Sequence, residues 1–271
     1  MQRLADKMRI RALTMAYECG VNTHIGGTLS IIELLAVLYG KVLRNLGEEA
    51  LFEEKDKFIL SKGHSALGLY AAMGEVGMLT EEQMAAFQQN GSELVAHPVM
   101  NTKLGIESSN GSLGQGVSMA VGLALSAKKK NRMYRTFVLV GNGECNEGIV
   151  WEAFETAVQF GLSDLTVIID NNKMQSDGCS ENVISVDNFG ERMKAFGFDV
   201  EEIDGHNVYE IETALMRGRA EGKPKAIIAH TIKGKGVSFM ENNNEWHHKR
   251  LTQEQYLRAL QELKGDNGYG H

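Results

Sequence analysis

Two patterns of apolar and polar positions divide the chain near residue 133. Before this point apolar residues recur at helical spacing, which predicts helices at about 3–19, 30–43, 66–73 and 80–89, with Ser30 and Thr80 as candidate caps. After it, short continuous apolar runs predict strands at about 134–140, 164–170, 198–204 and 224–231. Helices are expected between them at about 147–160 and 207–221.

Continuous apolar strands that alternate with helices are typical of a parallel sheet buried on both faces. The sequence therefore predicts an α/β fold with a parallel sheet and helices on both faces. We expect a single domain over 1–271, with a helical amino-terminal part, a last helix at about 251–263 and a polar tail.

Composition narrows the classes of protein. With 271 residues and 43% apolar content the chain can bury a sizeable core. The 28 basic and 35 acidic residues are interspersed and give a net charge of −7, so no nucleic-acid binding is expected. The longest mostly apolar window, about 117–127, is too short for a membrane span, so neither membrane insertion nor secretion is expected. Three cysteines without metal-type spacing (Cys19, Cys145 and Cys179) suggest reduced thiols in the cytoplasm.

Polar side chains follow two of the predicted strands. Asn142 lies in GNGECNEG and Asn172 in IIDNNKM, and the carboxyl ends of parallel strands meet at one edge of a sheet. Their side-chain oxygens, with the carbonyl of Met174, suit Mg²⁺, which prefers oxygen ligands. Gly143 lets a diphosphate approach closely, and a helix beginning near Asn146 would point its amino end toward that charge. Asn-Gly is also a common turn, so this pattern alone leaves both interpretations open.

Histidines and glycines recur in a set order along the chain. They lie in HIGGTLS (His24), LSKGHSALG (His64), VAHP (His97) and EWHHK (His247), together with SSNGSLGQG and HTIKGKG. Taken singly, each histidine is more often a surface or core group than a ligand. As an ordered set they resemble the amino-terminal half of a transketolase, a thiamine diphosphate enzyme, over nearly its whole diphosphate-binding module. The resemblance is greatest to split transketolases, in which this half is a separate subunit.

The resemblance implies a site residue by residue. It implies Mg²⁺, or Ca²⁺ or Mn²⁺, at Asn142, Asn172 and the Met174 carbonyl, with an asparagine where the family has the aspartate of GDG. It further implies cofactor contacts from His64, Gly111, Ser112, Leu113, Gly143, Asn172, Lys233 and His247. The catalytic histidines would be His24, His64, His97 and His247, of which His24 and His97 face the donor sugar.

Some positions are less well defined by the resemblance. His97 lacks the glycine that usually precedes it in the family, and His248 adjoins His247, so a shift of one residue stays open there. Glu147 matches a glutamate at the family's subunit interface. His206 is expected to be a turn residue, as are Asn22 and Thr23.

The family's remaining cofactor contacts belong to a second module, usually on another polypeptide. No further sheet is predicted after Lys235. The resemblance therefore implies a C-terminal transketolase subunit that supplies the pyrimidine-binding module, in an α2β2 assembly. Together they would transfer a two-carbon ketol unit from a ketose to an aldose, with phosphorylated sugars expected as substrates.

Two alternatives stay open. Another thiamine diphosphate enzyme would catalyse 2-oxo acid decarboxylation or xylulose-phosphate synthesis, although the set of sugar-facing histidines argues against it. A non-catalytic scaffold subunit is favoured only by Asn142.

Overall fold

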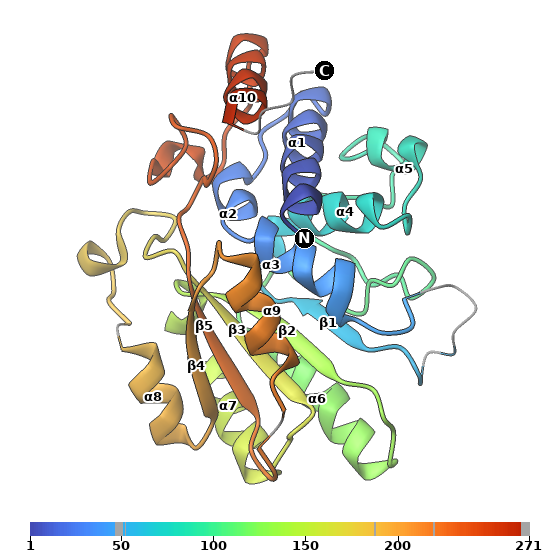
Figure 1. Cartoon of the computed structure of the whole chain (residues 1–271), viewed down its shortest axis with the longest axis vertical. Coiled ribbons are helices and arrows are strands. Elements are labelled where there is room, and N and C mark those ends of the chain that lie inside the picture. The colour runs from blue at the N-terminus through green and yellow to red at the C-terminus, as the bar shows by residue number, and fades with distance from the viewer. Residues whose placement is uncertain (47–50, 52, 187, 219, 267–271) are drawn as a thin grey trace.

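A five-stranded parallel sheet with the strand order β1-β2-β3-β5-β4 forms the centre of the computed structural model (Figure 1). The structure describes residues 1–46, 51, 53–186, 188–218 and 220–266. The strands are β1 (Lys57–Leu60), β2 (Thr136–Gly141), β3 (Leu165–Asn171), β4 (Asp199–Asp204) and β5 (Lys225–His230). The predicted α/β fold is confirmed.

Alternate side chains of the strands enter two apolar cores, one on each face of the sheet. Along β2, Phe137 and Leu139 belong to the first core, and Val138 and Val140 belong to the second. The first core includes α1 (Gln2–Glu18), α2 (Ile25–Leu29), α3 (Ile32–Val37), α4 (Ala66–Glu75), α5 (Glu81–Ala85), α9 (Val208–Met216) and α10 (Gln253–Asp266). The second includes α6 (Gln115–Lys129), α7 (Gly148–Gln159) and α8 (Phe189–Phe196). Figure 1 shows α9 in front of the sheet and α6 and α7 behind it.

The amino-terminal helices are more broken than the periodicity predicts. The expected helix at 30–43 is split into α3 and a π-helical turn over Leu38–Val42, and a separate short helix, α2, precedes it. Ser30 is not the N-cap of α3, because Ile31 takes that position; Ser30 ends α2 instead, and its hydroxyl bonds the Gly27 carbonyl and Asp170. Thr80 does cap α5, in a reciprocal capping box with Gln83.

Two expected helices end early. The one at 80–89 stops at Ala85, because the chain turns back and the Gln88 N–H bonds the Leu94 carbonyl. The one at 207–221 stops at Met216, because Arg217 has an extended ψ of 136°. Position 219 lies outside the described residues.

The carboxyl-terminal helix is confirmed as α10, and the expected polar tail at 267–271 lies outside the described residues. Among the described α-helices and strands, four are not predicted by the apolar pattern, namely β1, α2, α6 and α8. Within the described part of the chain, every helix is too short or too polar to cross a lipid bilayer.

Candidate functional site

Loops from the carboxyl ends of four strands surround a cavity of about 440 Å³. These loops carry His64 after β1, Asn142 after β2, Asn172 after β3 and Lys233 after β5. The predicted residues that line the cavity are His24, His64, Gly111, Leu113, Asn142, Gly143, Asn172, Met174, Lys233 and His247. The convergence expected from a parallel sheet is therefore observed.

Two predicted residues do not line the cavity wall. Ser112 is exposed. His97 lies at the edge of the His24 ring, with ring centroids 5.5 Å apart. It therefore joins the histidines beside the cavity and does not face the cavity itself.

His24 is the centre of this histidine cluster. Its ring centroid lies 5.4 Å from that of His64 and 5.4 Å from that of His247, and it stacks on His248 at 4.4 Å. His247 and His248, the two candidates for the last histidine of the ordered set, therefore both contact His24. His247 is the one that lines the cavity.

Burial lowers the pKa of four of these histidines, His24, His64, His97 and His247, and keeps their rings neutral. Desolvation, with neighbouring histidines, lowers the pKa of His24 to about 3, and desolvation together with Lys233 lowers that of His247 to about 4. Burial also lowers the pKa of His64 and, less completely, that of His97. A neutral imidazole has one nitrogen that donates and one that accepts, which suits proton exchange with hydroxyl groups.

Lys233 brings a cation to the cavity, next to His247. Its Nζ donates to the carbonyl of Gln175 at 3.2 Å and to Asn244 Oδ1 at 2.7 Å, and lies 3.1 Å from His247 Nδ1. Burial, with repulsion from Lys62, lowers the pKa of Lys233 to about 8. The ammonium is thus held by neutral acceptors, and an anion in the cavity would stabilise it.

The two asparagines present oxygen atoms at neighbouring strand ends. Asn142 Nδ2 donates to Ser180 Oγ at 2.8 Å, so its carbonyl oxygen Oδ1 is the atom that could bind a cation. Asn172 Oδ1 accepts from the Met174 N–H at 3.0 Å, and its Nδ2 donates to Asp170 at 2.9 Å. In the described chain no three His, Cys, Asp or Glu side chains form a metal-binding group. A cation here would be held by amide and carbonyl oxygens.

Asp170 is a site residue that the sequence reasoning missed. It is fully buried at the end of β3, and its carboxylate accepts from Lys62 Nζ, Ser30 Oγ, Thr231 Oγ1 and Asn172 Nδ2. It joins the end of β3 to Lys62 after β1, to Ser30 after α2 and to Thr231 after β5. A carboxylate inside the apolar run TVIID was the available signal, because buried charges need partners.

Glu144 was missed for a similar reason. Its Oε1 accepts from Ser61 Oγ at 2.5 Å and from the Gly114 N–H at 2.8 Å, and its Oε2 accepts from the Gly141 N–H at 3.1 Å. Although these bonds oppose the shift, burial raises the pKa of its carboxyl group. The side chain ties three segments of the cavity wall together.

Glycines leave room where the wall is tightest. A Cβ on Gly143 would lie 3.0 Å from Gln175 Cγ, and one on Gly27 would lie 3.2 Å from His64 Nε2. Together with the oxygen pair and Lys233, this cradle fits a diphosphate and its metal ion.

Comparisons with known proteins identify the family of the chain. The family model described as the thiamine diphosphate binding domain of transketolase matches residues 1–269. An apulose-4-phosphate transketolase subunit from Actinobacillus succinogenes is 36% identical, over 98% of this chain and 96% of its own. A 6-deoxy-6-sulfo-D-fructose transketolase subunit from a Clostridium species is 38% identical, over 97% of this chain and 96% of its own.

Solved structures give the same result for the fold. Transketolase from Leishmania mexicana superposes with a TM-score of 0.88 at 28% identity, covering 96% of this chain and 41% of that one. Transketolase from Campylobacter jejuni gives 0.87 at 28% identity, covering 99% and 43%. The chain thus spans less than half of these transketolases, but nearly the full length of the two transketolase subunits above. The predicted resemblance is confirmed, and the chain belongs to the transketolase family, as its thiamine diphosphate binding domain.

Proposed function

We propose that this chain is the N-terminal subunit of a two-chain transketolase, which transfers a two-carbon ketol unit from a ketose to an aldose. The observation that carries the proposal is the cluster of neutral histidines beside a cavity that also presents Asn142, Asn172 and Lys233. A site of this kind combines an anchor for an anionic cofactor with groups that handle sugar hydroxyls.

Thiamine diphosphate, when bound, supplies a nucleophilic carbon and accepts the electrons of the broken carbon–carbon bond. The chain's own residues anchor and orient it. Lys233 offsets the charge of the diphosphate, and Gly143 allows its close approach. His64 and His247, whose rings lie 5.6 Å apart, are the groups that would lie between the diphosphate and the substrate.

Oδ1 of Asn142, Oδ1 of Asn172 and the Met174 carbonyl would hold Mg²⁺, or Ca²⁺ or Mn²⁺. All three donors are neutral, whereas relatives with GDG offer a carboxylate at position 142. Removing that charge weakens attraction for the cation and also relieves repulsion of the diphosphate. We infer that the site binds metal more weakly than a GDG site does.

His24 and His97 are the groups proposed to exchange protons with the donor sugar. Their lowered pKa values keep them neutral at pH 7, so each ring can accept a proton from one hydroxyl and return it later. The two transketolase subunits reported above are named for sugars that carry a phosphate or a sulfo group. We therefore propose substrates with an anionic terminal group, as the expected sugar phosphates have.

The partner is proposed to be a C-terminal subunit that supplies the pyrimidine-binding module, in an α2β2 assembly. Both of these relatives are themselves named as one subunit of a transketolase. On this chain Glu147, Leu113 and Ile149 are exposed, and Glu147 and Leu113 line the cavity, so a partner docking there would close it. The free thiols Cys19, Cys145 and Cys179 support a cytoplasmic location.

The test is co-purification with the product of the neighbouring reading frame, followed by assays with thiamine diphosphate and Mg²⁺. The pair should transfer ketol units between members of a panel of ketose and aldose phosphates, and neither chain by itself should do so. Decarboxylation of 2-oxo acids without ketol transfer would favour the other enzyme class. Absence of cofactor binding in the assembled pair would favour a scaffold.

A further inference from the structure

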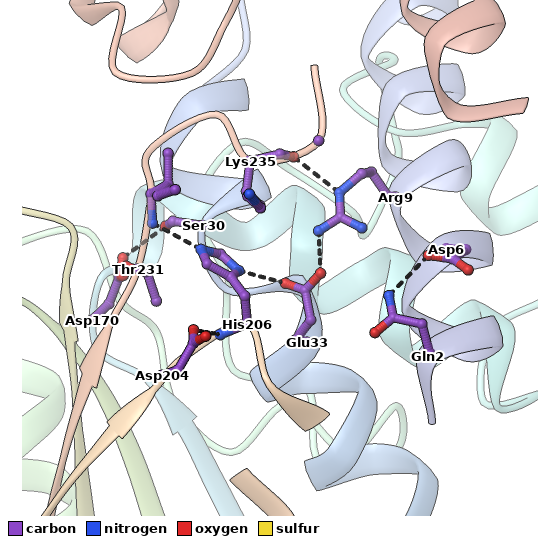
Figure 2. Close-up of polar contacts among 12 residues, drawn as sticks. Gln2, Asp6, Arg9, Ser30, Glu33, Asp170, Asp204, His206, Thr231 and Lys235 are labelled. Carbon is purple, nitrogen blue, oxygen red and sulfur yellow. Dashed lines mark hydrogen bonds and ion pairs between the residues drawn. The ribbon is translucent and has the colours of Figure 1, made fainter. Parts of the chain in front are cut away.

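A largely buried cluster of titratable residues adjoins the loop that carries Lys233, and the proposed chemistry does not use it. It consists of Arg9 on α1, Glu33 on α3 and His206 in the turn after β4 (Figure 2). Glu33 Oε1 receives a hydrogen bond from Arg9 Nη2, and Glu33 Oε2 lies 3.0 Å from His206 Nδ1. Arg9 is 4% and Glu33 3% exposed. Despite burial, which acts the other way, the bonds from His206 and Arg9 lower the pKa of Glu33.

Both partners of Glu33 also form hydrogen bonds with the loop that carries Lys233. The Ile232 N–H donates to His206 Nε2 at 2.8 Å, and Arg9 Nε donates to the Lys235 carbonyl at 3.0 Å. Lys233 lies between these two attachment points. Figure 2 shows His206 and Arg9 reaching Glu33 from opposite sides.

The hydrogen bonds define the protonation pattern of the cluster. Because His206 Nε2 accepts from a backbone N–H, it carries no proton, so the ring proton lies on Nδ1 and is donated to Glu33. Glu33 therefore receives two donors, one on each oxygen. A glutamine at this position has only one oxygen, so it would leave one donor unpaired in a buried place.

The loop that carries Lys233 is tightly folded and holds a buried charge, so it needs hydrogen bonds that keep it in place. Gly234 has a φ of +82°, and a Cβ there would lie 2.2 Å from the Met240 carbonyl oxygen, so the chain folds tightly next to Lys233. Lys233 itself is 2% exposed, and burial disfavours its charged form. A loop that carries a buried ammonium gains solvation by moving outward, so attachments are required to keep it in place.

We propose that Glu33, acting through His206 and Arg9, is a positioning residue that holds the Lys233 loop against the cavity. The identity of the anion that Lys233 meets rests on the proposed function, whereas the placement of Lys233 by Glu33 does not. Neither Glu33 nor His206 lines the cavity, so both act through Lys233.

The experiment measures the pKa of Lys233 in the full-length chain without cofactor. The ¹³Cε signal of labelled lysine is followed against pH and assigned by its absence in Lys233→Arg. The wild-type value should lie near 8, as the buried position predicts. Glu33→Gln and His206→Asn should raise it by one unit or more toward the ordinary 10.5, because the loop relaxes into water.

Matched variants separate this effect from general damage. A glutamine amide reaches the place of Nε2 and an asparagine amide that of Nδ1, so His206→Gln should keep the Ile232 bond but lose the bond to Glu33, and His206→Asn should do the reverse. Each variant breaks the link from Glu33 to the loop, so His206→Gln should also raise the pKa of Lys233. His230→Gln changes an exposed histidine at the end of β5, just before the Lys233 loop and bonded at 3.0 Å to Glu202, and should leave the pKa of Lys233 unchanged. If Glu33→Gln does not fold, the two His206 variants carry the test.

An unchanged or lowered pKa of Lys233 in folded Glu33→Gln and His206→Asn would overturn the proposal. Simple loss of a nearby negative charge lowers a lysine pKa, so a rise is specific to loop release. Titration of the wild-type assembled pair with thiamine diphosphate and Mg²⁺ tests the proposed function separately. Failure to bind there would count against that function and would leave the Lys233 result standing.

Discussion

Raising the pH through 8 should weaken the binding of thiamine diphosphate, because Lys233, which we propose to meet the diphosphate, then loses its charge. Its pKa is about 8, so at pH 9.5 the fraction of free protein that carries the ammonium is roughly 30-fold smaller than at pH values well below 8. The phosphate groups are already ionised above pH 7.5, since their last pKa is about 6. The dissociation constant should therefore be level below pH 7.5 and rise up to about 30-fold by pH 9.5.

The assay is quenching of Trp246 fluorescence in the assembled pair, at fixed Mg²⁺ and ionic strength. Trp246 is buried and directly precedes His247, so it reports on this wall of the cavity. Lys233→Arg is the matched control, because a guanidinium stays charged over this range and should flatten the profile. The reasoning is refuted if the wild type and Lys233→Arg show the same rise above pH 8.

Three further predictions concern the metal site, the buried histidines and a helix cap. Asn142→Asp should lower the Mg²⁺ concentration at half-saturation about tenfold, since one added charge attracts a divalent ion at contact range; equal midpoints in a titration would remove the idea. The free energy of unfolding should fall as pH drops from 6.5 toward 4, because the unfolded chain protonates His24 and His247 first. Partial exposure limits the loss to about 2–3 kcal/mol, measurable by urea unfolding. This loss of unfolding free energy should be smaller in His24→Asn. An unfolding free energy that does not change between pH 6.5 and 4 would contradict the burial argument. Thr80→Ala should cost about 1 kcal/mol by removing the capping box with Gln83, with a surface change such as Lys103→Ala as control; an equal loss in both would refute the role of the cap.

The later strands could be predicted from sequence because their apolar runs are continuous and bounded by turns. The run predicted at 164–170 is observed as Leu165–Asn171, and the one at 224–231 as Lys225–His230. Strand β1 has only four residues and begins with Lys57, which is buried beside Glu107 at 3.3 Å. A lysine at a strand start suggests a surface position, so the sequence alone did not indicate that strand.

Helix α6 was missed for the opposite reason. Its sequence is almost uniformly small or apolar, so it lacks the polar stripe that marks an amphipathic helix. It also begins after Gly114, which has a φ of +83° and offers no side-chain cap. Periodicity and capping, the two signals used for the other helices, are therefore both weak here.

The residues of the candidate site also fall into those that the sequence could predict and those that it could not. His24, His64 and His247 could be placed because an ordered set of motifs identifies them, and the structure brings them within 5.6 Å of one another. Asp170 and His206 could not, because their importance depends on contacts between segments far apart in the sequence. His206 does lie in a turn, as predicted, but its ring connects Glu33 to the Lys233 loop.

The most direct test of the central claim is an experimental structure of the chain with its partner, thiamine diphosphate and Mg²⁺. The account predicts the metal at about 2.1 Å from the side-chain oxygens of Asn142 and Asn172 and from the Met174 carbonyl, with Lys233 beside the diphosphate. A cavity left empty or filled by side chains in that complex, or a cofactor bound elsewhere, would contradict it.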